Sequence, residues 1–134
     1  MIRAYGDNDF TVLVSLINTA AEAYRGIIPP DCWKGPYMPM GELRDEIAAG
    51  VCFWIYEEDS SPIGVMGLQE VQNVTLIRHA YIAPTAQRRG VGGVLLTCCC
   101  ALAKRPVLIG TWAAADGAIQ FYKKNGFRIT EPVQ

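Results

Sequence analysis

The stretch from residue 51 to residue 83 constrains the fold of this chain most strongly, because it contains three strand candidates in immediate succession. The candidates are rich in apolar, β-branched and aromatic side chains and cover residues 51–56, 63–71 and 74–83. Turn-forming residues separate them, at positions 59–62 and 72–73. Connections this short join antiparallel neighbours. We therefore predict an antiparallel sheet at the centre of the fold.

Helical patterns lie on either side of this stretch in the sequence. Apolar residues recur with helical spacing or between capping signals at residues 10–24, 41–49, 91–104 and 116–124. Further strands are predicted at residues 2–5, 107–112 and 127–130. The strand, helix, strand order of residues 74–112 predicts a right-handed crossover between parallel strands. We expect an α/β fold with a mixed, mostly antiparallel sheet of six or more strands and helices on both faces.

Length and charge narrow the range of functions. A chain of 134 residues is expected to form one domain, residues 1–134. Twelve basic and thirteen acidic residues nearly cancel, which argues against nucleic acid as a partner. No apolar run is long enough to span a membrane, and the N-terminus does not resemble a signal peptide. We therefore expect a cytoplasmic protein that does not bind membranes.

The five cysteines do not suggest a metal site. Three of them are consecutive, Cys98 to Cys100, in a stretch that is predicted to be helical. Successive side chains on a helix point about 100° apart, so these thiols cannot converge on one ion. Cys32 and Cys52 stand alone in the sequence, and no Cys-x-x-Cys motif occurs. We expect free, partly buried thiols in a reducing compartment and no metal.

The segment 87–93, Gln-Arg-Arg-Gly-Val-Gly-Gly, has the composition of an anion cradle and lies between a predicted strand and a predicted helix. The first N–H groups of a helix have no intrahelical partner and carry partial positive charge, which favours phosphate groups. Gly90 and Gly92 have no Cβ atom to hold a ligand away from the backbone, and Arg88 and Arg89 add positive charge. This anion cradle predicts a ligand that carries a diphosphate.

Spacing distinguishes the ligand classes that use such glycines. A P-loop is excluded because the Gly-Lys-Ser/Thr ending is missing, and a dinucleotide fingerprint would require glycine where the chain has Leu95. What remains is the pattern Gln/Arg-x-x-Gly-x-Gly ahead of a helix, preceded by Ile82-x-Pro84 and followed by a second motif over residues 118–127. With both motifs in this order, the chain resembles the GNAT superfamily of acyl-CoA-dependent N-acetyltransferases over nearly its whole length.

This resemblance implies roles for particular residues. In the family, the coenzyme A diphosphate lies on the backbone of the cradle and the pantetheine arm runs beside the preceding strand. The cofactor-binding residues implied here are Ala80, Tyr81, Ile82, Gln87, Arg88, Arg89, Gly90, Val91, Gly92 and Gly93. A backbone N–H near Ile82 would polarise the acetyl carbonyl, and Tyr122 would protonate the departing thiolate. Acetyl-CoA is thus the implied acyl donor, and no metal is required.

The chain departs from the family at positions that bear on catalysis. Where relatives commonly carry an asparagine that contacts the cofactor, this chain has Ala115. Positions at which some relatives place an acidic base are Gly110, Leu76 and Arg78 here, and none of these side chains is suited to accept a proton. The sequence therefore leaves the general base open.

Five further residues are candidates for the site. Glu70, at a predicted strand end, is either solvated or a base that acts through water, and His79 is either structural or a general base. Strand alternation predicts that Arg78 shares a face with Ala80 and opposes His79, where Arg78 could bind a substrate carboxylate or be solvated. Trp33 and Tyr37, in a proline-rich segment, either line the acceptor site or pack beneath it.

We expect an enzyme that moves an acetyl group from acetyl-CoA directly to a primary amine on a small molecule or peptide. Two alternatives are a non-catalytic acyl-CoA-binding module or sensor and a nucleotide-binding domain. Family members generally add one more strand after the last one predicted here, so a shortened chain and a homodimer that completes the sheet edge are both open.

Overall fold

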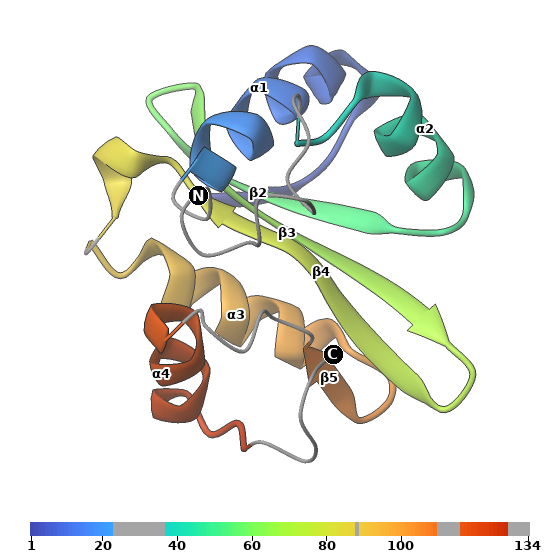
Figure 1. Cartoon of the computed structure of the whole chain (residues 1–134), viewed down its shortest axis with the longest axis vertical. Helices are drawn as coiled ribbons and strands as arrows, with labels where there is room; N and C mark the ends of the chain where they lie inside the picture. Colours follow the sequence, from blue (N-terminus) through green and yellow to red (C-terminus); the bar gives the residue numbers. More distant parts are fainter. Residues whose placement is uncertain (23–36, 88, 110–115, 129–134) are drawn as a thin grey trace.

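The computed structural model describes residues 1–22, 37–87, 89–109 and 116–128, with the side chains of residues 116–118 excluded (Figure 1). Its helices are α1 (Phe10–Ala21), α2 (Met40–Ala48), α3 (Val91–Leu102) and α4 (Asp116–Lys124), with 3-10 turns η1 (Asp7–Asp9) and η3 (Pro84–Ala86). Its strands are β1 (Ile2–Ala4), β2 (Cys52–Glu58), β3 (Ser61–Val71), β4 (Val74–Ile82) and β5 (Val107–Ile109). Every helix and strand described here overlaps an element that was predicted from the sequence.

The strands form one mixed sheet in the order β1-β2-β3-β4-β5. The first four pair in antiparallel fashion, and β4 pairs with β5 in parallel. The α/β class, the mostly antiparallel sheet and the parallel pair joined through α3 are thus confirmed. The described residues form five strands and not the expected six or more. Within the expected strand 127–130, residues 127 and 128 lie in no strand, and residues 129 and 130 are outside the described residues.

The end of α4 explains why Phe127 does not continue as a strand. Gly126 has φ 95°, and its N–H donates to the carbonyl of Lys123 at 3.1 Å. The N–H of Phe127 donates to the carbonyl of Tyr122 at 3.0 Å. This pair of bonds is a Schellman motif, in which the residues after the helix satisfy its last carbonyl groups. The backbone of Phe127 is therefore used to end the helix.

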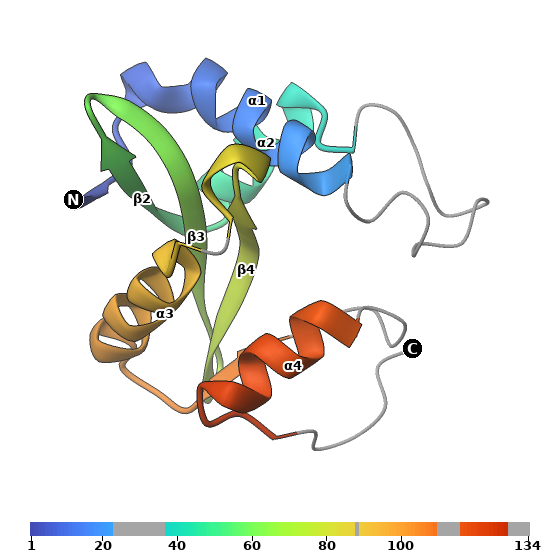
Figure 2. The same cartoon turned by 90° about the vertical axis from the view of Figure 1, so that its left-hand side faces the viewer.

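Helices cover both faces of the sheet, as predicted (Figure 2). On one face α1 and α2 pack against β2 and β3, and the buried core there consists of Leu13, Leu16, Ile17, Met38, Leu43, Val51, Phe53, Ile55 and Val65. On the other face α3 packs against β3 and β4, with α4 beside it, and the buried core consists of Met66, Leu68, Ile77, Val91, Leu95, Leu96 and Cys99. The sheet thus separates an α1/α2 face from an α3/α4 face.

A bulge interrupts β4 and changes which side chains share a face. Val65 pairs with Tyr81 and Gly67 pairs with Arg78, so two steps along β3 match three steps along β4. The extra residue lies at positions 79–80, which we call the β4 bulge, and His79 there has φ 55°. The bulge shifts the alternation by one residue. The prediction that Arg78 opposes His79 is therefore wrong, because both side chains contact Glu46 on the α1/α2 face.

Gly67 permits the close packing opposite this bulge. A Cβ atom at Gly67 would lie 2.9 Å from the carbonyl oxygen of Arg78, and 3.0 Å from side-chain atoms of both Phe53 and Val51. Carbon atoms normally approach to about 3.5–4.0 Å. A larger residue at this position would therefore have to displace the backbone of β4.

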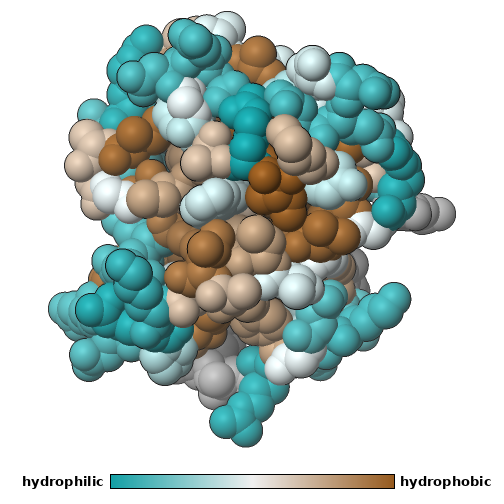
Figure 3. Space-filling model, turned by 180° about the vertical axis from the view of Figure 1, so that it is seen from behind, coloured by the Kyte–Doolittle hydropathy of each residue, from teal (hydrophilic) through white to brown (hydrophobic). Residues whose placement is uncertain are grey.

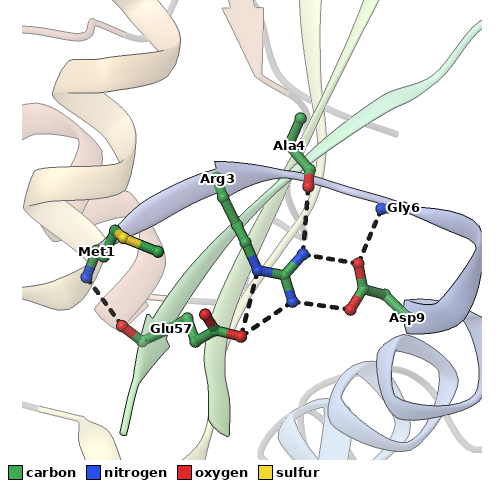
Figure 4. A network of polar contacts seen from close by, with 6 residues as sticks. All are labelled: Met1, Arg3, Ala4, Gly6, Asp9 and Glu57. Carbon is green, nitrogen blue, oxygen red and sulfur yellow. Dashed lines mark hydrogen bonds and ion pairs between the residues drawn. The ribbon is translucent and has the colours of Figure 1, made fainter. Parts of the chain in front are cut away.

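A network around Arg3 joins β1, η1 and β2 (Figure 4). The Arg3 guanidinium donates to both carboxylate oxygens of Asp9 at 2.8 Å and to Glu57 Oε2 at 3.0 Å. Asp9 also accepts the N–H of Gly6 at 2.8 Å. These hydrogen bonds, with that from Arg3 first in importance, hold the pKa of Asp9 at about 2. The ionised carboxylate of Asp9 therefore helps to hold β1 and η1 together near the N-terminus.

One face of the molecule shows a clear division by polarity (Figure 3). Seen from behind, hydrophobic residues form a band across the middle of the molecule, and hydrophilic residues lie above and below it (Figure 3). Among the described residues, no helix has both the length and the apolar character that crossing a membrane requires.

Candidate active site

The cradle predicted from the sequence forms the junction between β4 and α3. Gly90 is the N-cap residue of α3, with φ 81°, a left-handed conformation that favours glycine. The first intrahelical bond runs from the N–H of Val94 to the carbonyl of Gly90 at 3.1 Å. The N–H groups of Val91, Gly92 and Gly93 precede it, and the N-cap residue Gly90 has no side chain to cap them. Three consecutive donors therefore point out of the helix end, as an anion site requires.

Open space lies next to these donors. Cβ atoms built at Gly90 and Gly93 would meet no atom of the described residues within 4 Å. A surface hollow of about 560 Å³ extends from the cradle along α3, and its lining residues are Ile2, Gly90, Gly93, Val94, Thr97, Cys98 and Asn125. The cradle is thus accessible to a ligand larger than a single phosphate.

The polar side chains of the cradle have partners of their own. Arg89 forms an ion pair with Glu58, and the side chain of Arg89 is 47% exposed. This contact raises the pKa of Arg89, so the guanidinium stays charged at the rim of the cradle. Gln87 donates from Nε2 to the carbonyl of Ile82 at 3.4 Å. Arg88, the other predicted cation, lies outside the described residues.

The second half of β4 leaves one edge open beside the cradle. β5 pairs with β4 only at Thr75, Leu76 and Ile77, so residues 78–82 have no neighbour from the described residues on that side. The N–H of Ala83 donates to Ile63 in β3 at 2.8 Å. Because successive backbone groups alternate along a strand, the N–H of Ile82 is directed away from β3, toward the open edge. An extended ligand could therefore pair with this edge.

Helix α4 meets the cradle from the α3/α4 face. A Cβ atom at Gly92 would lie 3.3 Å from the ring of Phe121 and 3.7 Å from Ile82 Cγ1, so these three residues converge. The Tyr122 ring packs edge-on against Phe121 at 5.2 Å and against Phe127 at 5.8 Å between ring centroids. The fold thus brings the segment that carries Tyr122 to the end of β4 and the first turn of α3.

On the opposite face, polar side chains gather over the same part of β4. Tyr81 Oη donates to Tyr37 Oη at 2.9 Å, and their rings are edge-on at 6.1 Å between centroids. His79 Nε2 is bound to Glu46 Oε1, from which Arg78 Nη2 lies 3.6 Å away. Trp33, the other predicted acceptor-site residue, is outside the described residues. The open edge of β4 therefore has the cradle and α3 on one face and this polar group on the other.

A model of the acetyltransferase (GNAT) domain matches residues 49–129 of this chain. The chain belongs to the GNAT acetyltransferase family. The match covers β2 through α4, which includes the open edge of β4 and the whole cradle, whereas Tyr37 and Glu46 precede it.

Individual relatives agree with this assignment. The peptidyl-lysine N-acetyltransferase YiaC of Escherichia coli K12 is 28% identical over 90 residues, which are 66% of this chain and 58% of YiaC. Among solved structures, the PaiA N-acetyltransferase of Thermoplasma acidophilum in complex with coenzyme A has a TM-score of 0.77 at 18% identity, covering 96% of this chain and 89% of that chain. The aminoglycoside 6'-N-acetyltransferase AAC(6')-IG of Acinetobacter haemolyticus has a TM-score of 0.76 at 15% identity, covering 100% and 94%.

The GNAT domain does not bring Glu70 to this site. Glu70 accepts hydrogen bonds from Thr75 Oγ1 and from Arg105, both at 2.8 Å. These contacts, with Thr75 first, lower the pKa of Glu70, which makes it a weaker base. Its partner Thr75 lies seven residues before Ile82 on β4, which at about 3.3 Å per residue places it some 20 Å away. The sequence prediction for Glu70 as a base therefore finds no support in its position.

Glu46 is a residue at this site that the sequence reasoning missed. It lies on α2, 33 residues before His79, and no motif links the two positions. The helical pattern of residues 41–49 predicted only a short helix. Gly110 and Ala115, at which the GNAT domain departs from its relatives, lie outside the described residues. Only the folded structure could have shown the contact between α2 and β4.

The described residues contain no cluster of three His, Cys, Asp or Glu side chains able to hold a metal ion. Cys52, Cys98, Cys99 and Cys100 are free thiols. Burial raises the pKa of Cys99 to about 12, so this thiol stays protonated at neutral pH. Cys32 lies outside the described residues.

Proposed function

We propose that this protein is an N-acetyltransferase that moves an acetyl group from acetyl-CoA directly to a primary amine. The observation that carries the proposal is the open edge of β4 next to the free N–H groups of Val91, Gly92 and Gly93. An extended pantetheine arm can pair with such an edge while the diphosphate binds the helix end. The family assignment and the coenzyme A complex of PaiA support the same donor.

The binding residues proposed for the donor follow from this arrangement. Backbone N–H groups of residues 90–93 bind the diphosphate, with Arg88 and Arg89 as nearby cations. Gln87 fixes the turn through its bond to the Ile82 carbonyl. The backbone of Ala80, Tyr81 and Ile82 forms the edge along which the arm lies. These are the residues named by the resemblance, and the described ones among them lie along the continuous path from the β4 bulge to α3.

For the chemical step, the N–H of Ile82 is proposed to bind the acetyl oxygen as negative charge develops on it. Tyr122 is proposed to donate a proton to the departing thiolate. A phenol with an ordinary pKa of about 10 protonates a thiolate of pKa about 8.5 only from a close and oriented position. The packing of the Tyr122 ring between Phe121 and Phe127 supports such an orientation.

The acceptor is proposed to approach from the α1/α2 face, because α3 and the cradle occupy the other face. Tyr37 and Arg78, with Trp33 from the preceding segment, are proposed to line the acceptor site. YiaC is described as a peptidyl-lysine acetyltransferase and AAC(6')-IG as an aminoglycoside acetyltransferase. Lysine peptides and aminoglycosides are therefore the first acceptors to test. A reducing cytoplasm is the proposed location, in keeping with the free thiols.

Thermal shift and thiol release test the proposal in two stages. Acetyl-CoA at about 100 times its dissociation constant adds about 2.7 kcal/mol of stability, whereas ATP and NAD are expected to leave the melting temperature unchanged. A screen over amine classes then measures release of the coenzyme A thiol. Tyr122→Phe is expected to lower kcat without weakening acetyl-CoA binding. Binding without turnover on any amine would instead favour an acyl-CoA sensor, and an unmoved melting temperature would contradict both.

A further inference from the structure

His79 and Glu46 form a pair on the acceptor face to which neither the family motifs nor the comparisons assign a role. His79 Nε2 is bound to Glu46 Oε1, and the two side chains are only 13% and 17% exposed. The contact connects α2 to the middle of β4 across 33 residues of sequence. A partly buried carboxylate on an imidazole is the arrangement by which proteins fix the orientation and tautomer of a histidine.

The backbone of His79 is in an unfavourable conformation for a residue with a side chain. Its φ of 55° lies in the left-handed region, in the middle of a strand. Such a conformation costs a non-glycine residue about 1–3 kcal/mol, and glycine commonly occupies the left-handed position of a bulge. An imidazole therefore stands where a glycine would be unstrained. Strain of this kind concentrates at functional sites, which favours a function for the imidazole side chain of His79.

The contact with Glu46 decides which ring nitrogen is free. An ionised carboxylate only accepts hydrogen bonds, so in the neutral ring Nε2 carries the hydrogen and Nδ1 keeps its lone pair. No group within the described part of the chain forms a hydrogen bond with Nδ1. Arg78 Nη2, 3.6 Å from the same carboxylate oxygen, is a cationic partner for Glu46. The pair thus presents one basic nitrogen that has no structural partner among these residues.

The position of His79 agrees with the direction of the acceptor. His79 directly precedes Ala80, and Ile82 lies three residues further along the open edge. Its side chain is on the α1/α2 face, as is the Tyr37–Tyr81 pair, whereas Ala80 and Ile82 pack on the α3/α4 face. We propose that His79, oriented by Glu46, is the base that removes a proton from the acceptor ammonium. This inference rests on the proposed acetyl transfer and names the base that the sequence left open.

The proton balance of the step is complete with these residues. Nδ1 of His79 takes one proton from the ammonium group, and the neutral amine forms a bond to the acetyl carbon. The carbon–sulfur bond then breaks and the electron pair leaves with sulfur, which takes the proton of Tyr122. The new amide nitrogen loses its second proton, which returns through solvent to Tyr122. The proton on His79 passes to solvent, so the net products are the amide, the free thiol and one proton.

The charges around the ring are few. In the described part of the chain, α2 contributes Glu46 and β4 contributes Arg78, while β2 contributes the uncharged Phe53, whose ring centroid is 6.1 Å from that of His79. The tyrosines of the neighbouring pair, Tyr37 and Tyr81, are the other titratable groups on this part of the face. Glu46 is therefore the charged side chain in direct contact with the ring.

The test compares His79→Gln and Glu46→Gln with Asp45→Asn. Glutamine at position 79 can still donate to Glu46 but has no basic nitrogen. Asp45→Asn removes the same charge from the adjacent, exposed position of α2 and serves as the matched control. With acetyl-CoA and a lysine peptide or aminoglycoside that the wild-type protein acetylates, kcat of His79→Gln should fall about 10²–10⁴-fold. Glu46→Gln should show a smaller loss, Asp45→Asn none, and the thermal shift with acetyl-CoA should be the same in all four proteins.

Two readouts separate a base from a structural histidine. In His79→Gln the rate should rise about tenfold per pH unit toward the pKa of the amine, about 10 for lysine, whereas the wild-type rate should level off at a lower pH. In His79→Gly, in which the backbone is unstrained, added imidazole should restore part of the lost rate.

Each result bears on a definite part of the scheme. An unchanged kcat in His79→Gln overturns the role of His79 and leaves the proposed acetyl transfer standing. A loss of rate with neither the steep pH dependence nor rescue by imidazole also overturns it, because His79 would then be structural. Absence of thiol release by the wild-type protein with every amine class overturns the proposed function, and the base with it.

Discussion

Replacement of Gly67 by alanine should destabilise the protein and disturb the β4 bulge. The added Cβ atom would lie 2.9 Å from the carbonyl oxygen of Arg78 and 3.0 Å from atoms of Phe53 and Val51, about half an ångström too close on three sides. Overpacking of this kind costs about 1–3 kcal/mol. The loss of glycine flexibility in the unfolded chain returns up to about 1 kcal/mol. We therefore expect a net loss of about 1–2 kcal/mol.

Thermal and urea unfolding measure this effect directly. At about 3–5 °C per kcal/mol for a chain of this size, the melting temperature of Gly67→Ala should fall by about 3–10 °C. Gly41→Ala in α2 is the control, because a Cβ atom there meets nothing within 4 Å and alanine favours the helix by up to about 1 kcal/mol. The clashing carbonyl belongs to Arg78, the residue before His79. The rate of acetyl transfer should therefore also be lower in Gly67→Ala, even at temperatures well below its melting range. A variant that melts within 1 °C of the wild type (about 0.3 kcal/mol or less) would refute the packing argument.

Three further predictions concern the Arg3–Asp9 ion pair, the backbone of Gly90 and the side chain of Glu70. Arg3 holds the pKa of Asp9 at about 2, below its ordinary 3.8, so the pair stabilises the fold fully above about pH 4 and this contribution is lost as pH falls through about 2. In urea titrations, Asp9→Asn should therefore cost about 1 kcal/mol at pH 7, because partial exposure reduces the effect of the full shift, and clearly less at pH 2. Gly90→Ala should lower the free energy of unfolding by about 1–2 kcal/mol, because the backbone at Gly90 is left-handed. It should also weaken acetyl-CoA binding measured by calorimetry, and an unchanged affinity would contradict the proposed role of the cradle in binding. Glu70→Gln should leave kcat within about twofold of the wild-type value, because removal of a catalytic base would lower kcat about a hundredfold or more.

Local signals in the sequence were sufficient for most of the fold. The short turns after β2 and β3 predicted antiparallel neighbours, and the helix after β4 predicted the parallel pair with β5. Asp116–Lys124 was predicted with the bounds that the structure gives. The strand predicted from Phe127 was wrong at residues 127 and 128, because a Schellman motif depends on hydrogen bonds at the helix end, which hydrophobic periodicity does not indicate.

The site was predictable only where it consists of backbone. The cradle follows from the order of Gly90, Gly92 and the helix start, all of which are local in the sequence. The face predicted for Arg78 was wrong, because the bulge adds one residue to β4 and no glycine or proline in the sequence marks its position. Glu46 could not be found, because its contact with His79 depends on how α2 packs across the sheet.

The extra residue in β4 also determines how tolerant this strand is to changes in length. Because two steps along β3 match three steps along β4 between Arg78 and Tyr81, deleting one residue between them would make the steps equal and restore regular pleating. Tyr81 would still face α1 and Ile82 would still face α3, and the pairing with β3 after this point would be unchanged. A deletion at the bulge is therefore absorbed locally, whereas a deletion in the regular part of β4 would turn the rest of the strand over.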